Sequence, residues 1–256
     1  MATGGQHRFL EAMMRAQYDR LNGELILTHL LDNPAWHAMT TNHRSISVGD
    51  ECARRYRADV SPIAALADVA NERGWLALGR LAGNGVVGLV GVAPELLPDG
   101  WTIHWHFPFV QMTCTVDTFR GSCNTVDVLT LAETDTPAML QLVSAAKPGP
   151  MERRTIDMGR YVGIKSGGKL LSMAGERLVF PGYVEVASVC TDPAHSGKGF
   201  AEMVTTAITA GIVERGDTAF LHVRQDNHRA VSLYSQLGFA ERCVIPIVAV
   251  SLSENA

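Results

Sequence analysis

Hydrophobic and polar positions follow two different periods along this chain, and they are clearest in its second half. Residues 125–131, TVDVLTL, have the two-residue period of a strand, and residues 133–146 have the helical period before a stop at KPGP. Two strands are predicted over 160–166 and 169–180, because the glycine pair between them supplies the positive φ angles of a tight hairpin turn. The pattern therefore predicts alternating strands and helices here.

The same pattern continues to residue 238. A strand is predicted over 183–190, followed by a turn and a helix that begins after Gly199. The apolar face of this helix consists of Phe200, Met203, Val204, Ala207, Ile208 and Ile212. A strand over 218–224 and a short helix over 228–237 come next, with Asn227 as N-cap and Gly238 as C-terminal cap.

The first half of the chain shows weaker patterns. Residues 7–22 and 61–78 have helical periodicity, the latter with Ser61 as a plausible N-cap, and an Asn-Pro break lies at Asn33. The polar, turn-prone letters DTFRGSCNT near 116–124 predict a junction. We therefore divide the chain into an N-terminal accessory α/β domain, 1–122, and a second domain, 123–256.

Two motifs in the first half suggest chemistry, and each has a simpler interpretation. Gly83, Gly85 and Gly88 fit the dinucleotide fingerprint GxGxxG, but a helical segment precedes them and a β-branched run follows, so a loop leading into a strand is predicted. His104 and His106 alternate with aromatic residues and would share one face of a strand. No third metal ligand of matching placement is evident, which favours a polar strand face over a metal site.

Composition and charge narrow the possible functions. The chain has 256 residues, of which 46% are hydrophobic and 19% charged, with a formal net charge of -4. This is typical of a globular protein, and the absence of a basic face argues against nucleic acid or an anionic membrane as partner. Apolar runs are too short for a bilayer span and no secretory signal is evident, so a cytoplasmic location is predicted.

The cysteines are odd in number and scattered, without the CxxC pairs of a zinc or redox site: Cys52, Cys114, Cys123, Cys190 and Cys243. Reduced, mostly buried thiols are therefore expected. Cys190 lies in the apolar run VEVASVC, where a small buried thiol is more common than a nucleophile.

The most informative stretch is VCTDPAHSGKGFA, residues 189–201. A strand, a glycine turn and a helix start leave backbone N–H groups pointing outward, and the helix dipole there favours negative charge. Missing side chains at Gly197 and Gly199 would permit close approach of a phosphate. The stretch is not a Walker P-loop, because it lacks the four-residue spacer and the Lys-Ser/Thr pair. The alternative is a structural turn without a ligand.

Together with the downstream stretch FLHVRQDNHRAVSLYSQLGF, this turn resembles the acetyl-CoA-binding half of a GNAT superfamily N-acetyltransferase. The resemblance covers roughly residues 125 to 250. It implies an α/β fold in which helices flank a mixed β-sheet, joined here to an N-terminal α/β accessory domain. That domain could instead be a degenerate second copy that has lost the phosphate turn.

The resemblance also implies a cofactor site for acetyl-CoA as cosubstrate. The family motif R/Q-x-x-G-x-G/A falls on Ser196, Gly197, Lys198, Gly199, Phe200 and Ala201, which would hold the pyrophosphate. Val189, Cys190 and Thr191 would contact the pantetheine arm, and Asn227 and Tyr234 complete the cofactor-binding set. Ser196 departs from the usual Arg or Gln, but backbone amides perform most of the binding in such a turn and Lys198 retains a nearby positive charge.

By the same resemblance, Tyr234 lies near the thioester sulfur and Glu185 occupies the strand that often carries a carboxylate base. His222, as a proton relay, and Arg177, as a partner for an acidic acceptor, are weaker candidates. The predicted activity is direct transfer of an acetyl group from acetyl-CoA to a primary amine of an unidentified acceptor. The alternatives are a non-catalytic acyl-CoA-binding sensor or regulatory module, and a protein-interaction domain that has lost the cofactor.

Overall fold

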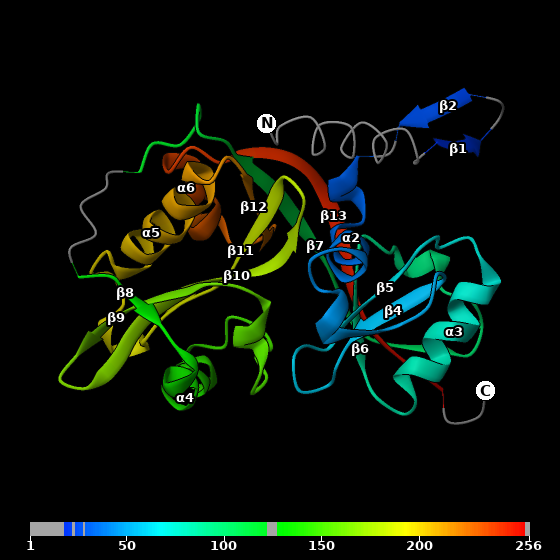
Figure 1. Ribbon diagram of the computed structural model, residues 1–256, viewed down its shortest axis with the longest axis horizontal. Coiled ribbons are helices and arrows are strands. Elements are labelled where there is room, and N and C mark those ends of the chain that lie inside the picture. The colour runs from blue at the N-terminus through cyan, green and yellow to red at the C-terminus, as the bar shows by residue number, and fades with distance from the viewer. Residues whose placement is uncertain (1–17, 22–23, 28, 122–126, 254–256) are drawn as a thin grey trace, which may run out of the picture.

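An eleven-stranded sheet runs through both halves of the molecule in the computed structural model, which describes residues 18–21, 24–27, 29–121 and 127–253 (Figure 1). Its strand order is β3-β4-β5-β6-β13-β7-β12-β11-β10-β9-β8. The strands are β3 (Ser47–Gly49), β4 (Ala53–Tyr56), β5 (Ile63–Leu66), β6 (Val87–Val90), β7 (Trp101–Cys114), β8 (Leu129–Leu131), β9 (Tyr161–Ser166), β10 (Lys169–Phe180), β11 (Tyr183–Thr191), β12 (Thr218–Arg224) and β13 (Ala240–Leu252). A separate hairpin pairs β1 (Tyr18–Leu21) with β2 (Glu24–Leu27).

Helices cover both faces of this sheet. They are α2 (Pro34–Thr40), α3 (Glu72–Ala82), α4 (Thr136–Ala146), α5 (Phe200–Glu214) and α6 (His228–Gln236). The short 3-10 helices are η1 (Leu30–Asp32), η2 (Arg44–Ile46), η3 (Pro94–Leu96), η4 (Glu133–Asp135), η5 (Thr155–Met158) and η6 (Pro193–His195). In the second half, α5 and α6 lie on one face and α4 lies on the other (Figure 1).

The two halves exchange strands at the centre of the sheet. β7, from the first half of the chain, lies between β12 and β13, and β13, from the second half, pairs with β6. Most strand pairs are antiparallel, but β5 with β6 and β11 with β12 are parallel, as a helix crossover requires. The predicted domain boundary at 122/123 falls within residues 122–126, outside the described residues. Each half therefore completes the sheet of the other.

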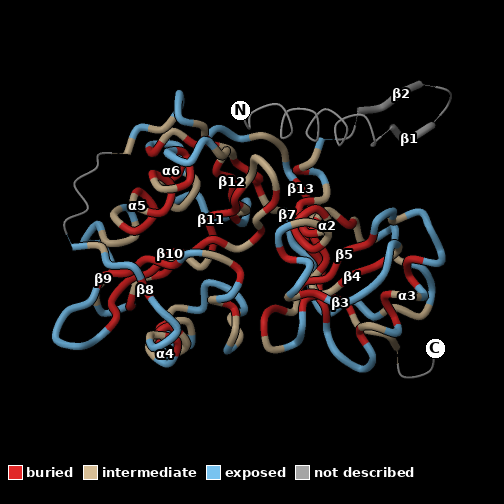
Figure 2. Tube along the Cα trace, viewed as in Figure 1, coloured by how far each residue is buried: buried red, intermediate tan, exposed pale blue. Residues whose placement is uncertain are grey.

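The hydrophobic core is also shared. One cluster packs Ala35 and Tyr56 of the first half against Leu178, Phe180 and Phe220 of the second. Figure 2 shows buried segments in the central strands of both halves. Burial of such side chains stabilises the fold by roughly 1.5–3 kcal/mol each relative to exposure. Separating the halves would expose this cluster to water.

The first half differs from its sequence-based prediction in two places and agrees with it at the Asn-Pro break. Residues 61–78 do not form one helix: Ile63–Leu66 are the fully buried strand β5, and a helix begins only at Glu72. The letters IAAL are apolar at every position, which suits a strand buried on both faces as well as a helix. Pro34 begins α2 immediately after the predicted Asn-Pro break. Tyr18–Leu21, predicted as the end of a helix, form β1, and the rest of that segment lies outside the described residues.

The structure confirms the loop and the strand that were predicted for the two motifs of this half. The GxGxxG stretch is a loop leading into β6, as its context indicated. His104 and His106 lie on β7, and among the described residues there is no group of three or more His, Cys, Asp or Glu that could hold a metal ion. None of the helices in the described part of the chain combines the length and apolar character needed to cross a membrane.

Candidate active site

Two parallel strands diverge at the centre of the second half. β11 and β12 pair only from Tyr183 to Glu185 and from Thr218 to Phe220, although β11 continues to Thr191 and β12 to Arg224. Beyond Glu185 the facing edges of the two strands no longer share a ladder. The main-chain groups on these edges are thus available to a ligand that enters from the carboxyl ends of the strands.

A β-bulge lies where the strands separate. The register between β10 and β11 shifts from Met173↔Cys190 to Gly175↔Ala187, so two residues of β11, Ser188 and Val189, face one residue of β10. Ser188 has a φ of 55°, a left-handed conformation that favours glycine. No sequence pattern identifies this residue, because serine is not a residue type that marks a left-handed position.

Along a strand, main-chain groups point alternately to the two neighbouring strands. The residues predicted to contact pantetheine therefore do not all point the same way. The N–H of Asp192 donates to Leu171 on β10, and the residue two positions earlier, Cys190, shares that orientation. The carbonyl of Cys190 also accepts a hydrogen bond of 2.9 Å from the Ser172 hydroxyl, and burial raises the pKa of its thiol to about 12. Thr191, between Cys190 and Asp192, therefore directs its main chain toward β12, while Val189 lies in the bulge.

The glycine turn lies at the carboxyl end of β11. Gly199 is the N-cap of α5 with a φ of 79°, and no side chain in the described part of the chain caps this helix. Gly197 has a φ of 80°, and a Cβ atom at either glycine would have no atom of the described residues within 4 Å. Uncapped N–H groups at a helix start, the positive end of the helix dipole and open space above both glycines fit a phosphate group.

The segment before the turn is held by local contacts. Asp192 accepts from the N–H of Ala194 at 2.9 Å and forms an ion pair with Lys169 at 2.5 Å. These contacts fix the start of η6, so the exposed residues Ser196 and Lys198 follow in a defined direction. Phe200 and Ala201, the last residues of the predicted motif, form the first turn of α5.

The short helix α6 carries both remaining cofactor candidates. Asn227 is exposed and caps the helix by accepting from the N–H of Ala230 at 3.2 Å. Tyr234 is 9% exposed and packs with Val186 of β11 and Val223 of β12, on the face covered by α5. Burial raises its pKa to about 12, and among the described residues its hydroxyl has no hydrogen-bond partner. Tyr234 is therefore a protonated donor next to the diverging strands.

Glu185 points to the opposite face, because its neighbours Val184 and Val186 belong to the cluster under α5. It is fully buried and bidentate to Arg177, with N–O distances of 2.8 and 2.7 Å, and it accepts from His222 at 2.7 Å. Burial alone would raise the pKa of Glu185, but Arg177 and His222 lower it to about 2. A carboxylate of such low pKa, with both oxygens engaged, is a weak base.

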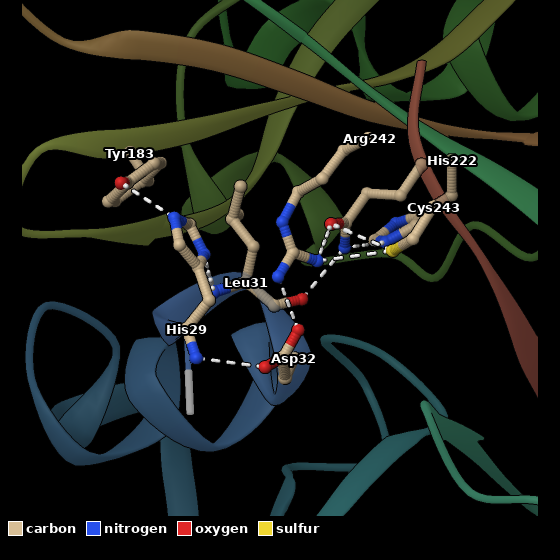
Figure 3. Close-up of polar contacts among 8 residues, drawn as sticks. His29, Leu31, Asp32, Tyr183, His222, Arg242 and Cys243 are labelled. Carbon is tan, nitrogen blue, oxygen red and sulfur yellow. Dashed lines mark hydrogen bonds and ion pairs between the residues drawn. The ribbon is translucent and has the colours of Figure 1, made fainter. Parts of the chain in front are cut away.

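His222 and Arg177, the two weaker candidates, are thus partners of Glu185. Gln111 fixes the tautomer of His222 (Figure 3): its carbonyl oxygen accepts from Arg242 at 2.8 Å, so its amide nitrogen is the donor toward the carbonyl of Leu31 and toward His222. His222 then accepts at Nε2 and donates from Nδ1 to Glu185. With both nitrogens engaged and its side chain 1% exposed, His222 is poorly placed to relay protons.

This network reaches the surface between the two halves. Arg242 forms an ion pair with Asp32, and the main-chain N–H of His29 donates to the same carboxylate at 2.8 Å (Figure 3). The ring of His29 meets the Tyr183 hydroxyl at 3.4 Å. Segments 29–32, β7, β11, β12 and β13 are therefore tied together by one chain of polar contacts. Sequence patterns could not reveal it, since its members come from five distant segments.

Comparison with known proteins gives matches to both parts of the molecule. A family model described as FR47-like protein matches residues 161–245, which contain the diverging strands and the glycine turn. The curated N-alpha-acetyltransferase RimI of Mycobacterium tuberculosis (strain ATCC 25618 / H37Rv) is 38% identical over 82 residues, or 31% of this chain and 51% of that protein. The chain thus matches about half the length of this relative.

Two solved structures extend the likeness. One, from Novosphingobium aromaticivorans DSM 12444 and assigned to the GNAT family of acetyltransferases, has a TM-score of 0.78 at 31% identity, covering 88% of this chain and 100% of that one. A GCN5-related N-acetyltransferase from Kribbella flavida has a TM-score of 0.61 at 18% identity, covering 86% and 95% of the two chains, and shares the fold. These matches confirm the predicted fold class, and the likeness includes the first half of the chain.

Proposed function

Because the chain belongs to the GNAT superfamily of N-acetyltransferases, we propose that it transfers an acetyl group from acetyl-CoA directly to a primary amine. The observation that carries this proposal is the uncapped start of α5 at Gly199, located where β11 and β12 diverge. A structural turn would not need an open anion site beside two unpaired strand edges.

The predicted cofactor residues divide into two groups. The main chain from Ser196 to Ala201 would bind the pyrophosphate, with Lys198 adding positive charge. Val189 and Thr191 would hydrogen-bond the pantetheine arm through their main chain, and Cys190 would support them from the sheet side. Asn227 would fix the start of α6 beside this arm.

Acetyl-CoA supplies an acetyl group activated as a thioester. The amine loses a proton during transfer, and the departing sulfur needs one or a hydrogen bond in its place. The Tyr234 hydroxyl, protonated and without a partner in the described part of the chain, would donate to the sulfur. The side chains of Val186 and Val223, which pack with Tyr234, would keep water away from this position.

Glu185 was the base expected from the resemblance, and its buried ion pair favours a different task. Taking up a proton would require Glu185 to give up a charge-assisted contact with Arg177 or His222. We therefore assign Glu185 to holding β10, β11 and β12 in register at the point of divergence. The proton of the amine would then leave to water.

The decisive experiment is turnover measured by release of free CoA thiol. Acetyl-CoA is offered with a panel of acceptors that includes small amines, amino acids and peptides with a free α-amino group. The peptides are included because the relative RimI is named an N-alpha-acetyltransferase. Thiol release that depends on one acceptor class would support the enzyme. Binding of acetyl-CoA without turnover on any class would support the sensor instead, and absence of binding would support the interaction domain.

Other parts of the prediction stay predictions. A cytoplasmic location, and the absence of a nucleic-acid or membrane partner, rest on the composition and charge of the chain. If the first half forms part of the acceptor site, the shared core around Tyr56 and Phe220 would fix its position relative to Tyr234.

A further inference from the structure

A second tyrosine reaches the diverging strands from the face opposite Tyr234. Tyr161 on β9 pairs with Gly175 on β10, which in turn pairs with Ala187 on β11. A Cβ atom at Gly175 would overlap the ring of Tyr161, so the ring lies directly across β10 at this glycine. The hydroxyl of Tyr161 is thereby carried toward β11 and the bulge at Ser188.

The environment of this hydroxyl is unusual. Tyr161 is 1% exposed and packs with Met139, Met173 and Cys190 on the face covered by α4. Its hydroxyl oxygen is buried and has no hydrogen-bond partner among the described residues. Burial raises the pKa of Tyr161 to about 12, while the neighbouring Ser188 hydroxyl acts in the opposite direction. Tyr161 is therefore a protonated donor, and Ser188 is the polar side chain beside it.

Ser188 is itself held in a costly conformation. Among the described non-glycine residues, only Lys147 and Ser188 have a positive φ angle. Lys147 ends α4, where a left-handed residue is common, whereas Ser188 lies inside a strand. Such strain persists only where the surroundings fix it, and it occurs preferentially at functional sites. The bulge at Ser188 also sets the main-chain direction of the next residue, Val189, on the edge that no longer pairs with β12.

We propose that Tyr161 is a positioning residue of the acetyl-transfer site, which acts through Ser188. In the complex with acetyl-CoA its hydroxyl, which has no partner among the described residues of the free protein, donates to the Ser188 hydroxyl and so keeps the bulge in the conformation that offers main-chain N–H groups to the acyl carbonyl. Gly175 is part of the device, because only glycine leaves room for the ring. This inference rests on the proposed function and adds a residue from β9, outside the strands that form the gap.

The first test replaces Tyr161 by Phe and uses acetyl-CoA labelled with ¹³C at the acetyl carbonyl. The infrared band of the bound carbonyl reports the strength of its hydrogen bonds, independently of any acceptor. We expect the Tyr161→Phe band to move toward the value of free acetyl-CoA, with affinity weakened about two- to tenfold. The Tm of the free protein should stay near that of the parent, because without acetyl-CoA the deleted hydroxyl has no hydrogen-bond partner among the described residues.

Two further variants make the result specific. Tyr56→Phe removes another buried tyrosine hydroxyl, one that does have a partner, His43, at 2.8 Å. We expect it to lower the Tm and to leave the carbonyl band unchanged. Ser188→Ala should reproduce the band shift of Tyr161→Phe, and the double variant should shift the band no further, since both side chains act in one contact.

The possible outcomes separate the two proposals. A Tyr161→Phe protein with the parent band would overturn the positioning role, as would a lower Tm with an unmoved band. Additive shifts in the double variant would overturn action through Ser188. If acetyl-CoA did not bind to the parent protein, the proposed function itself would fail.

Discussion

Each half of the molecule contains a strand–helix–strand unit, and the two units differ in how many of their main-chain groups form hydrogen bonds. We call them the first unit and the second unit. In the first half, β5, α3 and β6 form a parallel strand–helix–strand unit, and in the second half β11, α5 and β12 form another. In both, the two strands pair over a short stretch: from Ile63 to Ala64 in β5, and from Tyr183 to Glu185 in β11. A strand from the other half borders each unit: β13 lies beside β6, and β7 lies beside β12.

The two units differ in whether protein groups form hydrogen bonds with the main-chain N–H and C=O groups at the ends of their helices and strands. α3 begins at a side-chain cap, with Asn71 accepting from the N–H of Arg73 at 3.0 Å, whereas α5 begins at Gly199 without one. At the end of β5, the amide of Asn33 donates to the carbonyl of Leu66 at 2.8 Å. The first unit thus uses its own chain to satisfy groups that the second leaves open. The proposed binding site is therefore the place where main-chain groups lack hydrogen-bond partners within the described residues. This difference predicts how substitutions, truncation and acid affect each unit.

The largest effect is expected from removing the strand that the halves share. A chain beginning at Thr115 lacks β7, which leaves β12 and β13 without their common neighbour and exposes the core they cover. We expect no cooperative unfolding transition by circular dichroism. A chain lacking only residues 1–17 keeps all eleven strands of the sheet and should unfold cooperatively. A stable 115–256 fragment would show that the second unit is self-sufficient.

The next largest effect is expected on turnover, from a substitution beside the second unit. Tyr234→Phe removes the proposed donor to the sulfur, and a positioned acid contributes on the order of a hundred- to ten-thousandfold. We expect turnover to fall roughly ten- to a thousandfold, because CoA thiolate is a fair leaving group unaided. Binding of acetyl-CoA should persist. Tyr183→Phe, which removes a tyrosine hydroxyl near His29, serves as control. Turnover within twofold of the parent would exclude Tyr234.

Acid should weaken the fold through His43, in the first half of the chain, before it weakens the buried ion pair of Glu185 in the second unit. Burial lowers the pKa of His43 from 6.5 to about 4, so the unfolded chain binds this proton more readily than the folded protein. The stability from neutral His43 is complete above about pH 6.5 and is lost progressively down to about pH 4, by about 3 kcal/mol. Glu185, with a pKa lowered from 4.5 to about 2, contributes stability that is lost only below pH 4.5.

Urea unfolding between pH 7 and 4 measures the His43 contribution. The parent protein should lose stability over this range, and His43→Gln should show a flatter profile from a lower starting value. An identical pH profile in both proteins would mean that another group governs this window.

The smallest effect is expected at the cap of α3. Asn71→Ala removes the contact with the Arg73 N–H and should cost about 1 kcal/mol. The free energy of unfolding should fall by that amount, with acetyl-CoA affinity unchanged. Reduced affinity would show that the first unit takes part in binding the cosubstrate.

Local sequence patterns were sufficient to predict much of the second unit and the helix that follows it. The helix after Gly199, the caps at Asn227 and Gly238, and the strand over 218–224 could be predicted because a few neighbouring residues determine each of them. The glycine turn could be recognised for the same reason. The strand β5 could not, since the apolar letters of Ile63–Leu66 suit two periods equally.

Non-local contacts account for the rest. The exchange of β7 and β13 depends on residues more than a hundred positions apart, such as Val110 and Val244. The engagement of Glu185 depends on His222 and, through Gln111, on segment 29–32. The left-handed Ser188 depends on its surroundings and not on its residue type. None of these three features follows from a local sequence pattern.

The most direct test of the central claim compares one glycine from each unit. Gly199 and Gly83 both have a positive φ and open space where a side chain would project, so valine at either position strains the backbone without an internal clash. Acetyl-CoA at a hundredfold excess over its Kd should raise the Tm of the parent protein and of Gly83→Val by about 5–10 °C. Gly199→Val should be folded and show no shift. A full shift in Gly199→Val would contradict the account, because the cosubstrate would then bind away from the open start of α5.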